Sequence, residues 1–177
     1  ITFYEEHLKF ARENGDRRGE GNALGNLGIA HKNLGDAKKA ITFYEEQLVI
    51  VREIGDRRGE GNALGNLGTA YATLGDAKKA ITFYEEHLKF ARENGDRRGE
   101  GNALQGLGAA HAILGDAKKA ITFNEEQLVI VREIGDRRGE AFASWNLGLA
   151  YEKQEDYHQA AKFMQNCVDF ELEIGHP

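Results

Sequence analysis

The chain repeats itself every 40 residues, and this periodicity constrains its fold more than any other feature of the sequence. Residues 21–60 align with residues 61–100 without a gap and differ at nine positions. Residues 1–20 are identical to residues 81–100. A period of this length is typical of repeat proteins, in which each unit buries its apolar face against neighbouring units.

A longer period of 80 residues is superimposed on the first. Residues 41–60 and residues 121–140 differ only where Tyr44 is replaced by Asn124. The last unit, from Ala141 onward, departs most from the others.

The apolar spacing within each unit predicts two helices. After Asp56, and again after Asp76, apolar residues recur at intervals of three and four until a glycine is reached. Glycine suits the left-handed residue that ends a helix, and aspartate suits the N-cap of the next helix. Connections this short make consecutive helices antiparallel, and no strand-like alternation is present. The Gly-Asp pairs stand at 15/16, 35/36, 55/56, 75/76, 95/96, 115/116 and 135/136.

We therefore predict an all-α chain of about nine antiparallel-packed helices, arranged as a single array over residues 1–177. Residues 1–14 read as the second helix of a unit whose first helix is absent. Four complete helix pairs and a short tail follow, over 15–54, 55–94, 95–134, 135–174 and 175–177.

Glycines also recur inside the predicted first helices, where each costs about 1 kcal/mol relative to alanine. For Gly28, Gly68 and Gly108 we expect compensation through close approach of the partner helix. For Gly19 and Gly21 the alternative is that they merely loosen the first helical turn.

The residues within each unit resemble the tetratricopeptide repeat pattern, which runs Trp/Leu-x2-Leu-Gly-x2-Tyr on the first helix and Ala-x3-Phe/Tyr on the second. Four copies in phase cover the whole chain. They are Leu24, Leu27, Gly28, His31, Ala40 and Tyr44; Leu64, Leu67, Gly68, Tyr71, Ala80 and Tyr84; Leu104, Leu107, Gly108, His111, Ala120 and Asn124; and Ser144, Leu147, Gly148, Tyr151, Ala160 and Met164.

The 40-residue period departs from the usual period of about 34, and the closing proline is missing. This longer unit is similar to the subclass found in kinesin light chains, Pins-type spindle-orientation adaptors and many bacterial regulators. The resemblance implies a right-handed superhelix whose first helices line a concave groove that holds extended peptide segments.

Transferred residue by residue, the resemblance predicts a groove stripe on each first helix. An asparagine amide both donates and accepts, so it can pair with a ligand backbone in either direction. Within the first helices, most variation between near-identical units falls on this stripe, as differing pockets would require. Trp145 is either a groove contact or a residue packed under the last helix pair. The predicted groove residues are Asn22, Asn26, Ile29, Asn33, Asn62, Asn66, Thr69, Thr73, Asn102, Gln105, Trp145 and Asn146. The same stripe includes Gly25, Lys32, Gly65, Ala72, Gly106, Ala109, Ala112, Ile113, Phe142, Leu149, Glu152 and Lys153.

Composition excludes some partners and favours a protein ligand. The formal net charge is −6, which does not suit a surface for nucleic acid or anionic membrane. Cys167 is the only cysteine, so no internal disulfide forms, and no apolar run approaches a membrane span. We expect a cytoplasmic protein whose partner is a protein or peptide, with no nucleic acid and no membrane. Cys167 stands where the family prefers a small residue, and we expect a buried thiol there.

No pattern of catalytic or ligand-binding residues is present, and we expect neither enzymatic activity, nor a cofactor, nor a metal. The Glu pairs, such as Glu45 and Glu46, are repeated and identical, which indicates a solvated outer face rather than acid–base chemistry. His31 and His111 occupy the family's tyrosine position, so we expect them to pack. The Arg17/Arg18 pair and its equivalents at 57/58, 97/98 and 137/138 admit two interpretations: exposed salt bridges between repeats, or clamps for a peptide carboxylate.

Two alternative functions remain open. The apolar residues Phe3, Leu8 and Phe10 lack a preceding helix, and Phe163, Val168 and Phe170 lie on the last one. Open ends of this kind favour head-to-tail self-association. The chain could equally be a sensor part of a larger regulatory protein.

Overall fold

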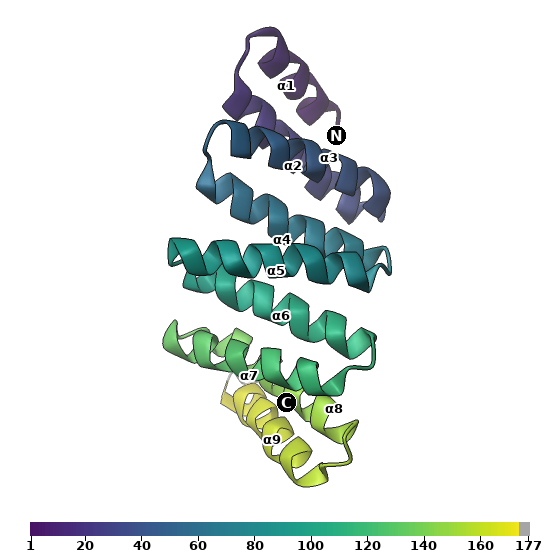
Figure 1. Ribbon diagram of the computed structural model, residues 1–177, viewed down its shortest axis with the longest axis vertical. Coiled ribbons are helices and arrows are strands. Elements are labelled where there is room, and N and C mark those ends of the chain that lie inside the picture. Colours follow the sequence, from purple (N-terminus) through teal and green to yellow (C-terminus); the bar gives the residue numbers. More distant parts are fainter. Residues whose placement is uncertain (174–177) are drawn as a thin grey trace. The chain divides into compact units, whose positions relative to one another are not determined.

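The computed structural model describes residues 1–173, and over this range it contains nine helices and no strand (Figure 1). The all-α repeat fold predicted from the sequence is confirmed, whereas the predicted tail, 175–177, lies outside the described residues. The helices are α1 (Thr2–Glu13), α2 (Arg17–Asn33), α3 (Ala37–Glu53), α4 (Arg57–Thr73), α5 (Ala77–Asn94), α6 (Arg97–Ile113), α7 (Ala117–Glu133), α8 (Arg137–Glu152) and α9 (Tyr157–Glu173).

The chain divides into two compact parts, an N-terminal half (Ile1–Glu86) and a C-terminal half (His87–Pro177). In the N-terminal half, α1 packs on α2, α2 on α3 and α3 on α4, and α2 also touches α4. In the C-terminal half, α6 packs on α7, α7 on α8 and α8 on α9, and α6 also touches α8. Each half therefore repeats one packing scheme, in which first helices lie next to each other. That both halves form a single array remains a prediction.

The joints between helices follow the Gly-Asp pattern. All seven joint glycines have φ between 66° and 85°, the left-handed region that a helix-ending glycine favours. The aspartate that follows caps the next helix; for example, Gly19 donates its N–H to Asp16 Oδ1 at 2.9 Å. The glycine pattern misses the eighth joint, where Glu155 adopts a φ of 61° before the N-cap Asp156.

The glycines inside the first helices allow a second helix to approach closely. A Cβ built on Gly68 would lie 2.5 Å from Cε1 of Tyr84, and one on Gly108 would lie 2.5 Å from Oδ1 of Asn124. The expected close approach at Gly28 is confirmed as well, because its Cβ would overlap the buried ring of Tyr44.

The histidines at the family's tyrosine position pack as expected. His31 and His111 are buried and stack on Phe43 and Phe123, with ring centroids 5.3 and 5.4 Å apart. Cys167 differs from expectation, because it is only half-buried. Its thiol lies 3.2 Å from the carbonyl oxygen of Ala141, on the neighbouring α8.

Candidate functional site

The twelve predicted groove residues lie on the first helices α2, α4, α6 and α8, and none of them is buried. The placement of Gly25 on the same open stripe is wrong, because Gly25 is buried beside Gln47. The neighbouring Leu24 and Leu27, predicted to face the core, are fully buried. The exposed members are Asn22, Asn26, Ile29, Asn33, Asn62, Thr69, Thr73, Asn102 and Trp145, and the half-buried members are Asn66, Gln105 and Asn146.

In the N-terminal half, two asparagine amides of the stripe form no hydrogen bonds within the described residues, whereas the threonine hydroxyls of the stripe do. The side chains of Asn26 and Asn66 form no hydrogen bond with any other described residue. By contrast, Thr69 and Thr73 donate their hydroxyls to carbonyl oxygens one helical turn earlier, each at 2.9 Å. The hydroxyl of Tyr84 also donates to Thr69 at 3.3 Å. The asparagine amides are thus the polar groups available to a ligand.

In the C-terminal half, α8 exposes an apolar stripe instead. Phe142 is 44% exposed, Trp145 is 48% exposed and Leu149 is 38% exposed, and their spacing of three and four places them on one helix face. The alternative that Trp145 packs into the core under the last helix pair is therefore wrong. Half of its surface is open to contact a partner.

A pocket of about 160 Å³ opens beside this stripe, between α6, α7 and α8. Ala109, Ala112, Asn146, Leu149, Glu152 and Lys153 belong to the stripe predicted from the sequence. The other lining residues come from the helix interfaces and are Gly108, Ala117, Ala120, Asn124 and Ala150. The predicted stripe thus reaches a concave site in this half.

Asn124 is the site residue that the sequence interpretation missed. It is 2% exposed, and its Oδ1 has no hydrogen-bond partner among the described residues. The signal was present in the sequence, because Asn124 is the only difference between residues 41–60 and residues 121–140. Its meaning required knowing that the equivalent Tyr44 fills the space beside a first helix.

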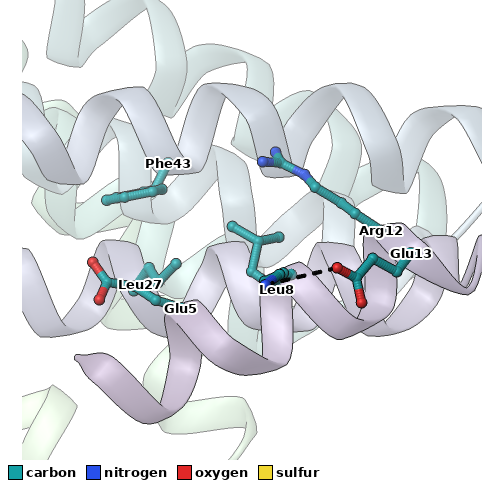
Figure 2. Close-up of a pocket in the computed structure, with 7 residues that line it drawn as sticks. Glu5, Leu8, Arg12, Glu13, Leu27 and Phe43 are labelled. Atoms are coloured by element: carbon teal, nitrogen blue, oxygen red, sulfur yellow. Dashed lines mark ion pairs between the residues drawn. The ribbon is translucent and has the colours of Figure 1, made fainter.

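A second pocket, of about 360 Å³, lies between α1, α2 and α3 in the N-terminal half. Figure 2 shows its apolar side chains, Leu8, Leu27 and Phe43, with Arg12 and Glu13 beside them. None of the predicted groove residues lines this pocket.

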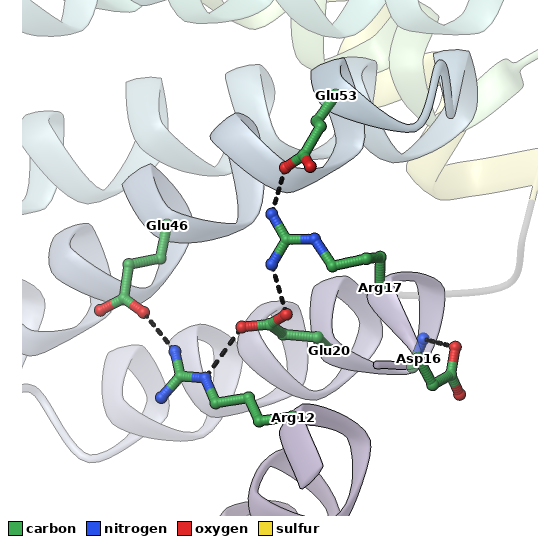
Figure 3. Close-up of polar contacts among 7 residues, drawn as sticks. Arg12, Asp16, Arg17, Glu20, Glu46 and Glu53 are labelled. Carbon is green, nitrogen blue, oxygen red and sulfur yellow. Dashed lines mark hydrogen bonds and ion pairs between the residues drawn. The ribbon is translucent and has the colours of Figure 1, made fainter. Parts of the chain in front are cut away.

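The predicted Arg pairs divide into a bridging and an exposed member, and Figure 3 shows the bridging member Arg17 with its partners. Arg17 on α2 binds Glu20 at 2.5 Å and also Glu53 on α3. Arg12 on α1 binds the same Glu20 at 2.8 Å and Glu46 on α3 at 2.8 Å. Arg17 therefore forms salt bridges, but they join helices of one repeat, and the expectation that it bridges neighbouring repeats is wrong; Arg12 makes those pairs. The sequence interpretation overlooked the part played by Arg12.

The arrangement recurs around Glu60, Glu100 and Glu140, each bound by an arginine from the preceding second helix and one from its own helix. The second arginine of each pair, Arg18, Arg58, Arg98 and Arg138, forms no ion pair with a described residue.

The buried Glu20 is held in its charged form by these arginines. Burial by itself raises the pKa of Glu20, but the hydrogen bonds and positive charges of Arg12 and Arg17 outweigh it, so that the net shift is downward. The same balance lowers the pKa of Glu100. The carboxylates thus stabilise the packing of α1, α2 and α3, and of the equivalent helices, at neutral pH.

Within residues 1–173, no three His, Cys, Asp or Glu side chains gather closely enough to hold a metal ion. Over the same range, none of the helices combines the length and the apolar character needed to cross a membrane. The paired glutamates have mostly structural contacts: Glu45 accepts a hydrogen bond from Tyr71, and Glu46 pairs with Arg12.

The family profile described as "Tetratricopeptide repeat" matches residues 19–93 and 99–170. Among curated proteins there is no significant match. The chain superimposes on the crystal structure of BtubC (BKLC) from P. vanneervenii with a TM-score of 0.90, at 20% sequence identity, over 99% of this chain and 73% of that one.

Two further solved structures share the fold. A putative kinesin light chain of Podosopora anserina with nearly identical TPR-like repeats gives a TM-score of 0.73 at 12% identity, covering 99% of this chain and 97% of that chain. A Rap protein complexed with competence and sporulation factor gives a TM-score of 0.76 at 14% identity, covering 97% of this chain and 54% of that chain. At these identities the likeness concerns the fold.

Proposed function

Because the chain belongs to the tetratricopeptide repeat family, we propose that it is a non-catalytic interaction module that holds an extended segment of a partner protein along its first helices. Repeats of this family generally mediate contacts between proteins. A Rap protein of the same fold is known in complex with competence and sporulation factor. The proposed ligand contacts are Asn26 and Asn66 in the N-terminal half and, separately, Asn146 in the C-terminal half.

The unpaired amides of Asn26 and Asn66 carry this proposal. They stand at equivalent positions of α2 and α4, two helices that touch each other. An amide on a solvated helix face contributes little to folding, since it pairs with water as readily as with protein. Placed along a peptide, each amide can donate to a backbone carbonyl and accept from a backbone N–H.

Replacing Asn26→Ala together with Asn66→Ala is expected to weaken peptide capture by about 30-fold, because at least one hydrogen bond of roughly 1 kcal/mol is lost at each position. The ligands are extended peptides selected from a random display library against the unmodified chain, and binding is measured by fluorescence anisotropy. The control is Thr42→Ala with Thr82→Ala, on exposed positions of second helices. Equal binding by all three proteins, with unchanged helicity, would refute the assignment of the stripe.

A second candidate function is self-association through α1. Phe3 and Phe10 are 72% and 65% exposed, whereas Phe90, which occupies the position of Phe10 in α5, is 8% exposed. Their spacing of seven residues places both rings on one face of α1, and exposed apolar side chains that share a face are typical of contact surfaces.

If α1 mediates self-association, Phe3→Ser with Phe10→Ser should abolish any concentration-dependent increase in sedimentation coefficient. Val49→Ser with Val129→Ser removes exposed apolar side chains from α3 and α7 instead, and should leave the increase intact. An unmodified chain that sediments as a monomer up to millimolar concentration would exclude this function.

Two further proposals concern the location of the protein and its place in a larger regulatory protein. A cytoplasmic location fits the single cysteine. A role as the sensor part of a larger regulatory protein is compatible with the same peptide-binding stripe, since ligand capture would then be the sensed event.

A further inference from the structure

We propose that the pocket between α6, α7 and α8 binds the phenol side chain of a tyrosine in the partner segment, whose hydroxyl pairs with the Asn124 amide. This inference rests on the proposed function, because it names the side chain that the bound segment inserts. It depends on the shape of the pocket, the chemistry of its walls and an unsatisfied polar group within it.

The pocket lies where the repeat normally places its own tyrosine. Tyr44 is fully buried and its ring packs against Gly28 of α2. Tyr84 is 8% exposed and packs in the same way against Gly68 of α4. Asn124 stands at this position against Gly108 of α6, and it lacks both the ring and the hydroxyl. Space that a phenol fills elsewhere in the chain is therefore available here to a phenol from outside.

The size and the walls of the pocket suit an aromatic ring. Its volume is about 160 Å³, and an apolar cavity of about 150 Å³ in a protein accepts a benzene ring. Five alanine residues line the pocket, together with Leu149 from α8: Ala109 and Ala112 from α6, Ala117 and Ala120 from α7, and Ala150 from α8. Burying a ring among these groups is favourable by roughly 25 cal/mol for each Å² of apolar surface removed from water.

The buried amide selects a hydroxyl group over a plain ring. Asn124 and Gly108 both line the pocket, and Asn124 Oδ1, which lies against Gly108, has no hydrogen-bond partner within residues 1–173. A buried polar atom without a hydrogen bond is costly, so a ligand that supplies one is favoured. A phenol hydroxyl can both donate and accept, and it can pair with either end of the amide. A phenyl group would leave the amide unsatisfied.

The rim of the pocket connects it to the proposed peptide-binding stripe. Asn146 lines the pocket and belongs to the stripe, and the exposed Trp145 is its neighbour on α8. A segment held through its backbone by Asn146 would pass the opening and could insert one side chain. Glu152 and Lys153, of opposite charge, also line the pocket and are exposed. Their opposite charges cancel, so the rim does not favour a charged ligand, which agrees with a neutral phenol.

The test uses p-cresol, which has the tyrosine side chain's ring and hydroxyl, and toluene, which lacks the hydroxyl. Binding to the whole chain is followed by NMR shifts of the Ala109 and Ala112 methyl groups and of the Asn124 amide. We expect p-cresol to bind at least 10-fold more tightly than toluene. Equal affinity of the two probes, or no binding of p-cresol, would overturn the inference.

Two variants isolate the residue responsible. Asn124→Tyr restores the residue found at the equivalent positions 44 and 84, so it should fold with unchanged or increased melting temperature and lose p-cresol binding by at least 10-fold. Asn124→Leu preserves approximate size without the amide, and it should reverse the preference in favour of toluene. Retention of p-cresol binding by Asn124→Tyr would place the probe elsewhere and contradict the inference.

Peptide binding separates this inference from the proposed function. Tyrosine-containing peptides selected by display should bind about 10-fold more weakly once their tyrosine is replaced by phenylalanine. This loss of affinity should occur with the unmodified chain and be absent with Asn124→Leu. If peptides bind without any such dependence, the tyrosine pocket is refuted and the interaction module stands. If p-cresol binds and no peptide does, the pocket serves a free phenolic compound, and both the tyrosine assignment and the proposed function fail.

Discussion

Gly28→Ala is expected to reduce the free energy of unfolding by about 2 kcal/mol, although alanine is the better helix former. The new Cβ would lie 2.6 Å from Cδ1 of Tyr44, well inside van der Waals contact. The ring is fully buried, so it can move aside only by displacing other core side chains. Overpacking therefore outweighs the gain of about 1 kcal/mol in helix propensity.

A double-mutant cycle identifies the ring as the cause. Tyr44→Ala alone should cost about 3–5 kcal/mol because it leaves a cavity. In that background Gly28→Ala should become neutral or slightly stabilising, since its Cβ enters empty space. Gly21→Ala is the control, because its Cβ would lie 3.4 Å from Ile50, an ordinary contact. Urea unfolding followed by circular dichroism measures the unmodified chain and the four variants. Equal effects of Gly28→Ala in both backgrounds would show that the ring does not restrict this glycine.

Glu20→Gln is expected to lower the free energy of unfolding at pH 7 by about 1–2 kcal/mol. The variant retains the shape of Glu20 but loses charge-assisted hydrogen bonds from Arg12 and Arg17. This loss is small for two charge-assisted hydrogen bonds because both arginines are partly exposed and their charges are screened by water. Glu6→Gln, at an exposed position of α1, should have little effect.

The same variant should change the pH dependence of stability. The folded-state pKa of Glu20 is lowered, so its stabilising effect is complete above the unfolded pKa of about 4.3 and is lost as pH falls through the folded value. The stability difference between the unmodified chain and Glu20→Gln should thus shrink below about pH 4. Thermal melts at pH values from about 3 to about 7 measure this difference, with most of the points close to the unfolded pKa of about 4.3. A constant difference over that range would contradict the assigned role.

The helices and most of the core could be predicted from the sequence because their signals are local. A glycine followed by an aspartate sets both ends of a joint, and the spacing of Leu24 and Leu27 identifies a buried face. The joint at Glu155 escaped prediction because its left-handed residue is not a glycine. The positions of Arg12 and Glu46 also gave no signal, since their contact joins residues on different helices.

The candidate site was predicted in part. The stripe of first-helix residues is accessible, as expected, because it continues the helical spacing away from the buried leucines. The pocket could not be predicted, since it depends on a ring that is missing at Asn124 and on how deeply Ala109 and Ala112 lie beside it. A pattern of residues identifies a helix face, but a cavity arises from what three helices together leave unfilled.

Helices α3 and α7 differ at one of the positions that they bury, with Tyr44 in one and Asn124 in the other. Near-identical helices can compete for the same partner while a repeat protein folds, and swapped pairings are a characteristic error of such chains. If α7 docked on α2, the space beside Gly28 would lack its ring and the mispaired product would contain a cavity, at a cost of several kcal/mol. The converse pairing of α3 with α6 would place Tyr44 in the open space beside Gly108, so the cavity disfavours only the docking of α7 on α2.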